Sequence, residues 1–212
     1  MACNCGLQEI FTYKVSRHDA SKYRRRGLDV RARRMLRALE QRVALRDKRT
    51  LEIGIGTGGF TIEMLRRGAS RAVGVDAMPN QLEQAKALAT EAGVADRLEL
   101  KQGDFTEVHD EVSPADVVVL DRVVCCYPDW RSLLDDAAAR AELLVVMSYP
   151  RSAWYTRIWV KAANVAMRML RRTFRLYLHA PAEMQALLRQ RGWTPQVIGH
   201  RVAWELLIAT RT

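Results

Sequence analysis

Four glycines fall within six residues, at Gly54, Gly56, Gly58 and Gly59, between an apolar run and a helical pattern. Glycine permits the tight turn and close backbone approach that a ligand-binding strand-to-helix loop needs. The spacing fits both the G-x-G-x-x-G pattern of dinucleotide sites and a G-x-G-x-G pattern. Glu52 precedes the first glycine by two residues and would repel a pyrophosphate at the helix N-terminus. It suits a cationic ligand that carries an ammonium and a sulfonium.

Three aspartates follow the next apolar runs of the chain. Asp76 ends the run 71–75, Asp104 follows the run 97–100, and Asp121 lies at the end of Val-Val-Val-Leu-Asp. Open parallel sheets bind ligands at the carboxyl ends of their strands, so we expect the three side chains at one edge. Asp76 could accept both hydroxyls of a ribose. Asp104 could accept an adenine amino group, with Phe105 stacking or packing nearby.

Alternating strands and helices are expected to position these residues. The pattern predicts strands over 50–55, 71–75, 97–100, 115–124 and 142–147, and helices over 28–43, 60–67, 79–92 and 129–140. Such alternation is typical of an α/β fold with a parallel sheet covered by helices. After Pro150 we expect a helical stretch over 151–178, a helix over 181–191, and an antiparallel pair over 196–200 and 202–209. We expect one domain over 1–212, divided into a helical cap (1–49), a core (50–150), an insertion (151–180) and a final helix and strand pair (181–212).

At these motifs the chain resembles the class I S-adenosylmethionine (SAM)-dependent methyltransferases. The resemblance covers about residues 28–150 and implies a Rossmann-like, doubly wound sheet of seven strands in the order 3-2-1-4-5-7-6, with strand 7 antiparallel. It implies SAM as cofactor, with the methionine part in the glycine loop, the ribose at Asp76 and the adenine at Asp104. The cofactor-binding residues expected on this basis are Glu52, Gly54, Gly56, Gly58, Asp76, Ala77, Met78, Asp104, Phe105 and Asp121. Segment 121–128 is similar to a subgroup labelled magnesium-protoporphyrin O-methyltransferase-like.

Methyl transfer by in-line displacement depends mainly on alignment and desolvation. A hydroxyl or protonated amine acceptor also needs a base, whereas a carboxylate acceptor does not. Asp121, Tyr127 and His179 are the candidate catalytic residues, with Tyr177 and His18 as further possibilities. The Asn/Asp-Pro-Pro-aromatic tetrapeptide of many DNA amino-methyltransferases is replaced by Asp-Arg-Val-Val at 121–124, which disfavours methylation of exocyclic base amines.

Charge is distributed unevenly along the chain, which has a net charge of +10. Residues 1–50 carry +9, residues 51–150 carry −8, and residues 151–175 carry +7 without a single acid. Apolar residues are interspersed with the basic ones in 151–180, and a helical stripe joins Trp154, Ile158, Ala162, Val165 and Met169. Three interpretations remain open: a lid over an apolar anionic acceptor, an interfacial helix on an anionic membrane, or a helix packed on the core with exposed arginines.

The four cysteines, Cys3, Cys5, Cys125 and Cys126, are too few for a disulfide scaffold. A four-thiolate zinc site is conceivable, but Cys-x-Cys and adjacent cysteines lack the usual spacing, and we expect no metal. The chain shows neither a signal-peptide pattern nor an apolar run of transmembrane length, which favours a cytoplasmic protein.

These features predict SAM-dependent methyl transfer to a small, apolar or anionic acceptor, with O-methylation favoured. The alternatives are a nucleotide-dependent oxidoreductase that uses the same glycines, and an RNA- or membrane-binding methyltransferase-like module. Nucleic acid is the less favoured partner.

Overall fold

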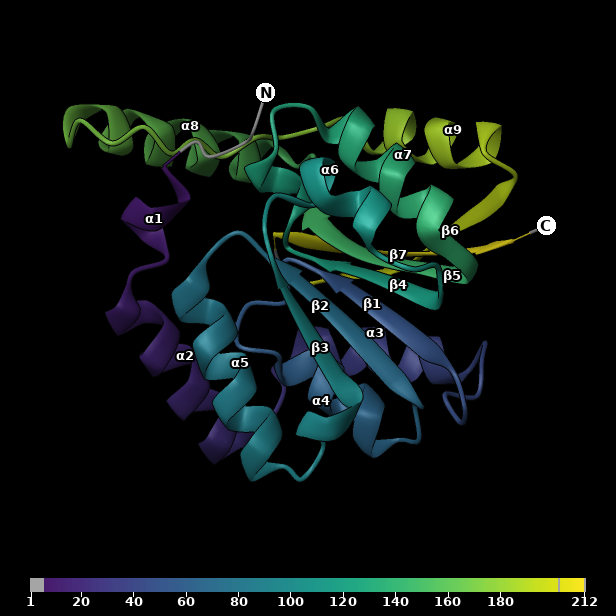
Figure 1. The fold of residues 1–212 in the computed structure, drawn as a ribbon. Helices are drawn as coiled ribbons and strands as arrows, with labels where there is room; N and C mark the ends of the chain where they lie inside the picture. Colours follow the sequence, from purple (N-terminus) through teal and green to yellow (C-terminus); the bar gives the residue numbers. More distant parts are fainter. Residues whose placement is uncertain (1–5, 202, 212) are drawn as a thin grey trace.

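The computed structural model describes residues 6–201 and 203–211 and is organised around one mixed sheet. Its seven strands have the order β3-β2-β1-β4-β5-β7-β6. Strands β1 to β5 pair in parallel, and β7 is antiparallel to both β5 and β6. The strands are β1 Arg49–Ile53, β2 Arg71–Asp76, β3 Leu98–Gln102, β4 Ala115–Asp121, β5 Ala141–Pro150, β6 Trp193–Arg201 and β7 Trp204–Arg211. The predicted strand order and the antiparallel strand 7 are confirmed (Figure 1).

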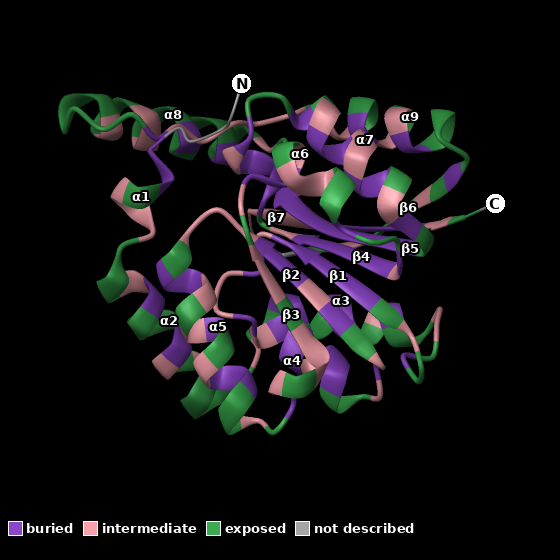
Figure 2. Cartoon of the chain, in the orientation of Figure 1, coloured by how far each residue is buried: buried purple, intermediate pink, exposed green. Residues whose placement is uncertain are grey.

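Helices cover both faces of this sheet (Figure 1). One face carries α3 Val30–Glu40, α4 Gly59–Arg66 and α5 Pro79–Glu91, and the other carries α6 Phe105–Val108, α7 Trp130–Arg140 and α9 Pro181–Gln190. In β4, Val117 and Val119 belong to the core on the first face, while Val118 and Leu120 belong to the core on the second. An uninterrupted apolar run therefore fits this strand, because both of its faces are buried (Figure 2).

The N-terminal segment contains two helices that the apolar pattern did not reveal, α1 Leu7–Ile10 and α2 Tyr13–Arg26. Helix α2 lies alongside α5 (Figure 1) and buries only the small residues Ser16 and Ala20. Polar bonds supplement this small contact: the Asn80 side-chain amide donates to the Phe11 carbonyl at 2.8 Å, and the Tyr23 hydroxyl donates to Glu63 at 3.0 Å. A helix held in this way has no long apolar stripe to detect.

Several predicted boundaries were wrong by two or more residues, and two of them have a clear cause in the backbone. Strand β4 ends at Asp121 rather than residue 124, because Arg122 takes a left-handed conformation (φ 62°) and a short 3₁₀ turn, Val124–Cys126, follows. The stretch 151–178 is helical only in α8, Trp154–Met169. Arg171 is left-handed (φ 54°), and the N–H of residue 172 bonds the carbonyl of residue 167, which closes the helix as a Schellman motif usually does with glycine.

After α8 the chain runs back along the helix (Figure 1). The Asn164 side chain holds this returning segment through two bonds to the Leu176 backbone, at 2.8 and 2.9 Å, and the Phe174 side chain is buried. The apolar stripe predicted for α8 lies on the solvent side of the helix instead of on the core.

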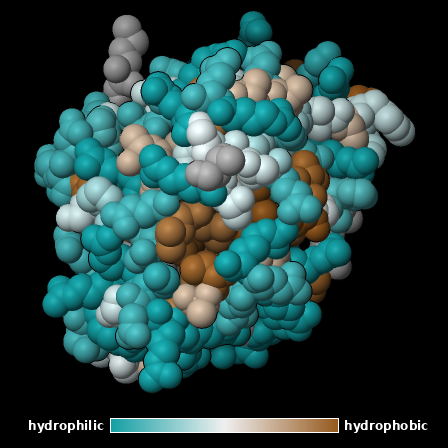
Figure 3. All heavy atoms as spheres, turned by 90° about the vertical axis from the view of Figure 1, so that its right-hand side faces the viewer, coloured by the Kyte–Doolittle hydropathy of each residue, from teal (hydrophilic) through white to brown (hydrophobic). Residues whose placement is uncertain are grey.

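The surface on the right of Figure 1, away from α8, is mostly hydrophilic, with hydrophobic residues gathered in a central hollow (Figure 3). In the part of the chain that the structure describes, no helix combines the length and apolar character needed to cross a membrane. A cytoplasmic location stays a prediction.

Candidate functional site

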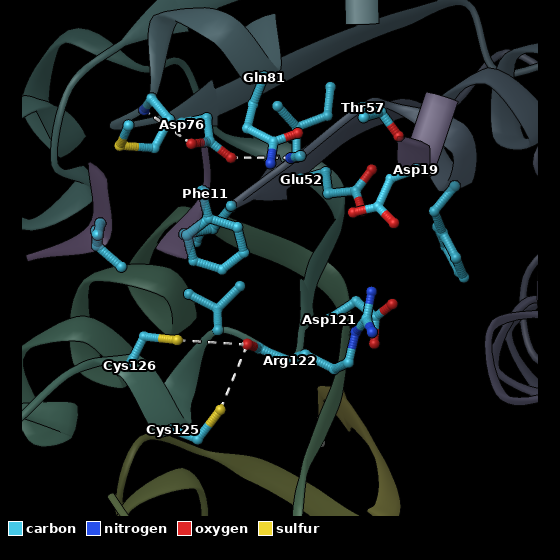
Figure 4. Close-up of a pocket in the computed structure, with 18 of the residues that line it drawn as sticks. Phe11, Asp19, Glu52, Thr57, Asp76, Gln81, Asp121, Arg122, Cys125 and Cys126 are labelled. Carbon is cyan, nitrogen blue, oxygen red and sulfur yellow. Dashed lines mark hydrogen bonds between the residues drawn. The ribbon is translucent and has the colours of Figure 1, made fainter. Parts of the chain in front are cut away.

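A cavity of about 590 Å³ lies at the carboxyl ends of β1, β2 and β4, between the sheet and helices α1, α2 and α8. Figure 4 shows Glu52, Asp76 and Gln81 on one side of it and Arg122, Cys125 and Cys126 on the other, with Phe11 between them. This volume is within the range usual for small-molecule sites.

The glycine loop forms one wall of the cavity. Gly54, Gly56 and Gly58 all have positive φ, at 66°, 56° and 78°, which explains why the loop requires glycine. A Cβ on Gly54 would lie 2.5 Å from the Val123 side chain, whereas a Cβ on Gly56 would meet nothing within 4 Å. No protein atom therefore fills the space next to the Gly56 Cα, so a ligand can approach the backbone there.

Glu52 lies beneath this loop and is almost completely buried. Its carboxylate accepts bonds from the Thr61 backbone N–H at 3.0 Å and from the Thr61 hydroxyl. Burial raises the pKa of Glu52 to about 8, and the nearby Asp121 and Asp76 carboxylates push it in the same direction, against the hydrogen bonds of Thr61. A buried carboxyl of this kind on a cavity wall would be favoured in its charged form by a cationic ligand.

Asp76 shapes the loop as well as facing the cavity. Its two carboxylate oxygens accept the backbone N–H groups of Gly56 and Met78, each at 2.9 Å. Burial outweighs these bonds and raises the pKa of Asp76. Ala77 and Met78 line the cavity beside it, and their role in cofactor binding stays a prediction.

Gln81 is a cavity residue that the sequence analysis missed. It is buried on the first turn of α5, and its side-chain oxygen has no hydrogen-bond partner among the described residues. A buried polar atom without a partner is costly, so a ligand donor at this position would be favoured. Its position in the helix after Asp76 was the only available signal, and a glutamine on a helix predicts no site by itself.

Asp104 is one of three predicted site residues that do not line the cavity, the others being Gly58 and His179. It caps α6, and one of its oxygens accepts from Thr106 N–H (3.1 Å), the Thr106 hydroxyl (2.9 Å) and the Tyr127 hydroxyl (2.9 Å). Phe105 and Tyr127 do line the cavity. The adenine-binding role of Asp104 therefore stays a prediction, and its observed contacts position the cavity residues around it.

Asp121 lies on the cavity wall in an ion pair with Arg31, and it also accepts the Ser148 hydroxyl. The Arg31 guanidinium bonds Asp29 at 3.2 Å and lies 5.9 Å from the centre of the Trp204 ring. The Arg31 side chain is buried, whereas Arg33, Arg34 and Arg37 of the same helix are exposed. The same carboxylate oxygen, Oδ1, thus takes part in both the Arg31 and the Ser148 contacts.

His179 faces away from the cavity. Its Nε2 bonds the Val124 and Tyr127 carbonyls, at 3.1 and 2.9 Å, and its ring stacks on Tyr177 with 6.0 Å between ring centres. Burial lowers the pKa of His179 in spite of the two backbone carbonyls. Neither Tyr177 nor His18, the other candidates named from the sequence, is among the residues that line the cavity.

The two adjacent cysteines line the cavity opposite the glycine loop. The thiols of Cys125 and Cys126 point toward the Arg122 carbonyl, at 3.5 and 3.9 Å (Figure 4). Within residues 6–201 and 203–211, no group of histidine, cysteine and acidic side chains could hold a metal ion. The zinc site considered from the sequence also required Cys3 and Cys5, which lie outside the described residues.

The remaining wall combines polar residues of α2 and the start of α3, which are Asp19, Lys22, Tyr23, Asp29 and Arg31, with an apolar part. The members of the apolar part belong to α1, α8 and the adjoining loops, and they are Leu7, Ile10, Phe11, Trp159, Ala163, Met167, Phe174 and Leu176. Lys22 and Arg122 add two cations to the lining. The cavity therefore has a mainly polar half at the strand ends, α2 and α3, and an apolar half at α1 and α8.

Residues 50–141 match a family model described as a methyltransferase domain. Part of the chain also resembles two curated methyltransferases. A ribosomal RNA small subunit methyltransferase H from Ruegeria sp. (strain TM1040) is 39% identical over 87 residues, 41% of this chain and 26% of that protein. A ribosomal protein L11 methyltransferase from Escherichia coli O8 (strain IAI1) is 37% identical over 75 residues, which are 35% of this chain and 25% of that protein. The chain thus matches about a quarter of the length of each.

Solved structures share the fold over most of the chain. The magnesium protoporphyrin IX methyltransferase from Synechocystis PCC 6803 with bound SAH has a TM-score of 0.67 at 17% identity and covers 86% of this chain and 81% of its own. An O-methyltransferase family protein from Burkholderia thailandensis has a TM-score of 0.74 at 16% identity. The match covers 98% of this chain and 64% of that protein's chain. At these identities the likeness shows the fold.

Proposed function

We propose that this chain, whose residues 50–141 match a methyltransferase domain model, is a SAM-dependent methyltransferase that transfers a methyl group to a small apolar acceptor carrying a carboxylate. The division of the cavity is the observation that carries this proposal. Its polar half has the loop, carboxylates and amide that suit a cationic adenosine compound, its apolar half suits an apolar acceptor, and Lys22 and Arg122 are among the cations that line the cavity.

The polar half fits SAM on the chemistry of its own residues. Gly56 leaves the backbone open to a ligand, Glu52 offers a buried carboxyl to a cation, and Gln81 offers an oxygen that has no partner among the described residues. Asp76 has lone pairs left for ribose hydroxyls after bonding two backbone N–H groups. When bound, SAM supplies the electrophilic methyl group.

A carboxylate acceptor is favoured because the candidate bases are otherwise engaged. Asp121 is paired with Arg31, and the Tyr127 hydroxyl donates to Asp104 at 2.9 Å. The His179 ring does not line the cavity, and its Nε2 bonds backbone carbonyls. A carboxylate has a nucleophilic oxygen without loss of a proton, so the protein need only align it and exclude water. Lys22 and Arg122 would hold the anion, and the apolar wall would hold the rest of the acceptor.

The test begins with calorimetric titration of the protein with SAM and with S-adenosylhomocysteine, using NADH as the control. Binding of the first two without NADH supports the cofactor assignment, and binding of NADH alone would point to the oxidoreductase alternative. The next step is transfer of labelled methyl from SAM to matched acceptors: aromatic and aliphatic carboxylic acids, a porphyrin carboxylate, and the corresponding primary amides. Label lost on mild alkaline treatment identifies a methyl ester, and transfer only to amides or alcohols refutes the carboxylate assignment.

RNA is the second acceptor to test. The relative from Ruegeria is a ribosomal RNA methyltransferase, and residues 1–50 carry a charge of +9. The apolar character of the acceptor half favours a small molecule, because RNA recognition relies on phosphate contacts and stacking. Alkali-stable label in ribosomal RNA, with none in the carboxylic acids, would favour the RNA alternative.

A further inference from the structure

Helix α8 has two apolar sides. Toward the protein it buries Thr156 and Val160, and Trp159, Ala163 and Met167 line the cavity. On the opposite side Trp154, Ile158, Val165 and Met169 are 73%, 58%, 57% and 79% exposed. We call these four side chains the α8 outer face. They are large apolar groups on a helix that lies at the edge of the molecule (Figure 1).

Basic side chains flank this outer face on one side. At ~100° per residue, the four apolar residues occupy an arc of roughly 60°. Arg157, Lys161 and Arg168 occupy the adjacent arc and are also exposed. No acidic residue occurs between positions 151 and 180. The returning segment does contact one carboxylate, because the Thr173 backbone N–H donates to Glu9 of α1 at 2.9 Å. The helix therefore presents a long apolar stripe with a cationic border.

We propose that the α8 outer face docks on the surface of an anionic lipid bilayer. An interfacial helix lies in the plane of the membrane with its apolar side in the acyl boundary and its lysines and arginines at the headgroups. Both parts of the α8 surface then have a partner. A nucleic acid would meet the cations but leave Trp154 and Met169 in water, and docking through the apolar stripe alone would leave the cationic border unused.

Docking would also place the cavity beside the lipid. The side of α8 opposite the outer face is part of the cavity wall, through Trp159, Ala163 and Met167. An apolar carboxylate acceptor dissolved in the bilayer could then reach the cavity along the helix. This consequence depends on the proposed function, whereas the docking itself does not.

Vesicle co-sedimentation of the full chain tests the proposal. We expect the protein to sediment with vesicles of equal parts phosphatidylglycerol and phosphatidylcholine, to stay in solution with phosphatidylcholine alone, and to be released by salt. The triple variant Arg157→Gln, Lys161→Gln, Arg168→Gln should lose about fivefold in affinity for each charge removed, about a hundredfold in all. A matched triple variant on α3, Arg33→Gln, Arg34→Gln, Arg37→Gln, removes the same charge on the far side of the sheet and should bind nearly as well as wild type.

A second variant, Trp154→Ser with Met169→Ser, tests the apolar stripe. Both side chains are mostly exposed, so the fold should persist, as far-ultraviolet circular dichroism and calorimetric SAM binding would verify. We expect vesicle binding to fall at least tenfold in this variant.

The proposal is overturned if neither vesicle type binds the wild-type chain, or if the α8 and α3 charge variants lose affinity equally. It is also overturned if the serine variant keeps full vesicle affinity, or if wild type forms a dimer that the serine variant abolishes. If the wild-type chain binds vesicles but does not bind SAM, the proposed function is refuted and the docking proposal stands.

Discussion

The protonation of Glu52 should make the stability of the ligand-free protein decrease as the pH rises. Its carboxyl is buried with two other carboxylates nearby, and its pKa rises from 4.5 to about 8. Between these two values the folded state keeps a proton that the unfolded chain releases. Stability from this group is therefore complete below pH 4.5 and is lost as the pH passes through about 8.

The size of the effect follows from the linkage relation. Each pH unit within this window lowers the free energy of unfolding by about 1.4 kcal/mol, which amounts to about 3 kcal/mol between about pH 5 and 7.5. Glu52→Gln removes the titration and keeps an oxygen that can accept the Thr61 N–H. Between about pH 5 and 7.5, the free energy of unfolding of the variant relative to wild type should therefore rise by about 3 kcal/mol.

Urea denaturation of both proteins without ligand, at a series of pH values, measures this difference. Glu63→Gln serves as the control. Burial raises the Glu63 pKa, but hydrogen bonds from Arg67 and Tyr23 outweigh it and lower the pKa, so its contribution should be constant above pH 4.5. Parallel pH profiles for wild type and Glu52→Gln would refute the reasoning, since they would mean that Glu52 is ionised in the fold. The same variant should weaken SAM binding, because the charged partner of the cation is gone.

Four further substitutions separate cofactor binding from stability. Asp76→Ala should weaken SAM binding by about 10- to 100-fold in calorimetry, because bonds to a charged carboxylate shape the loop. Gln81→Leu should cost about 2- to 12-fold in the same assay, as expected for one neutral hydrogen bond. Arg31→Met should lower the free energy of unfolding by about 3–5 kcal/mol in urea, because it leaves Asp121 as an unpaired, largely buried charge. The pKa of His179 is lowered, so wild type should lose stability as the pH falls below 6.5, and His179→Gln should reduce that slope.

The cofactor half of the molecule could be predicted from the sequence because its signals are local. A buried strand appears in the sequence as an apolar run, and the positive φ angles of the loop require glycine. Asp76 lies at the end of β2. Parallel strands bring their carboxyl ends to one edge, so residues far apart in sequence were correctly expected together. Asp104 shows the limit of this reasoning, because the end of a strand does not fix whether a side chain faces the ligand or caps the next helix.

The parts that the sequence missed depend on contacts between distant segments. Helix α2 is fixed by polar bonds and small residues, so it has no apolar period. In the sequence Arg31 cannot be told from the other arginines of α3. Its side chain is buried because it pairs with Asp121 at the end of β4, a contact between distant segments. The end of α8 depends on a left-handed Arg171, a residue type that gives no stop signal.

The two halves of the cavity come from different parts of the chain, and this division bears on how the acceptor is chosen. The residues matched by the family model, 50–141, supply the loop, Glu52, Asp76 and Gln81. Most of the apolar wall comes from outside this range, from α1 at one end of the chain and α8 with its returning segment near the other. Glu9 joins these two flanking segments through its bonds to Thr173. Because the acceptor wall is built by segments that pack on each other, it can vary in shape while the cofactor loop keeps its geometry. Acceptor choice is therefore best sought in the flanking segments, on the same helix whose outer face we assign to the membrane.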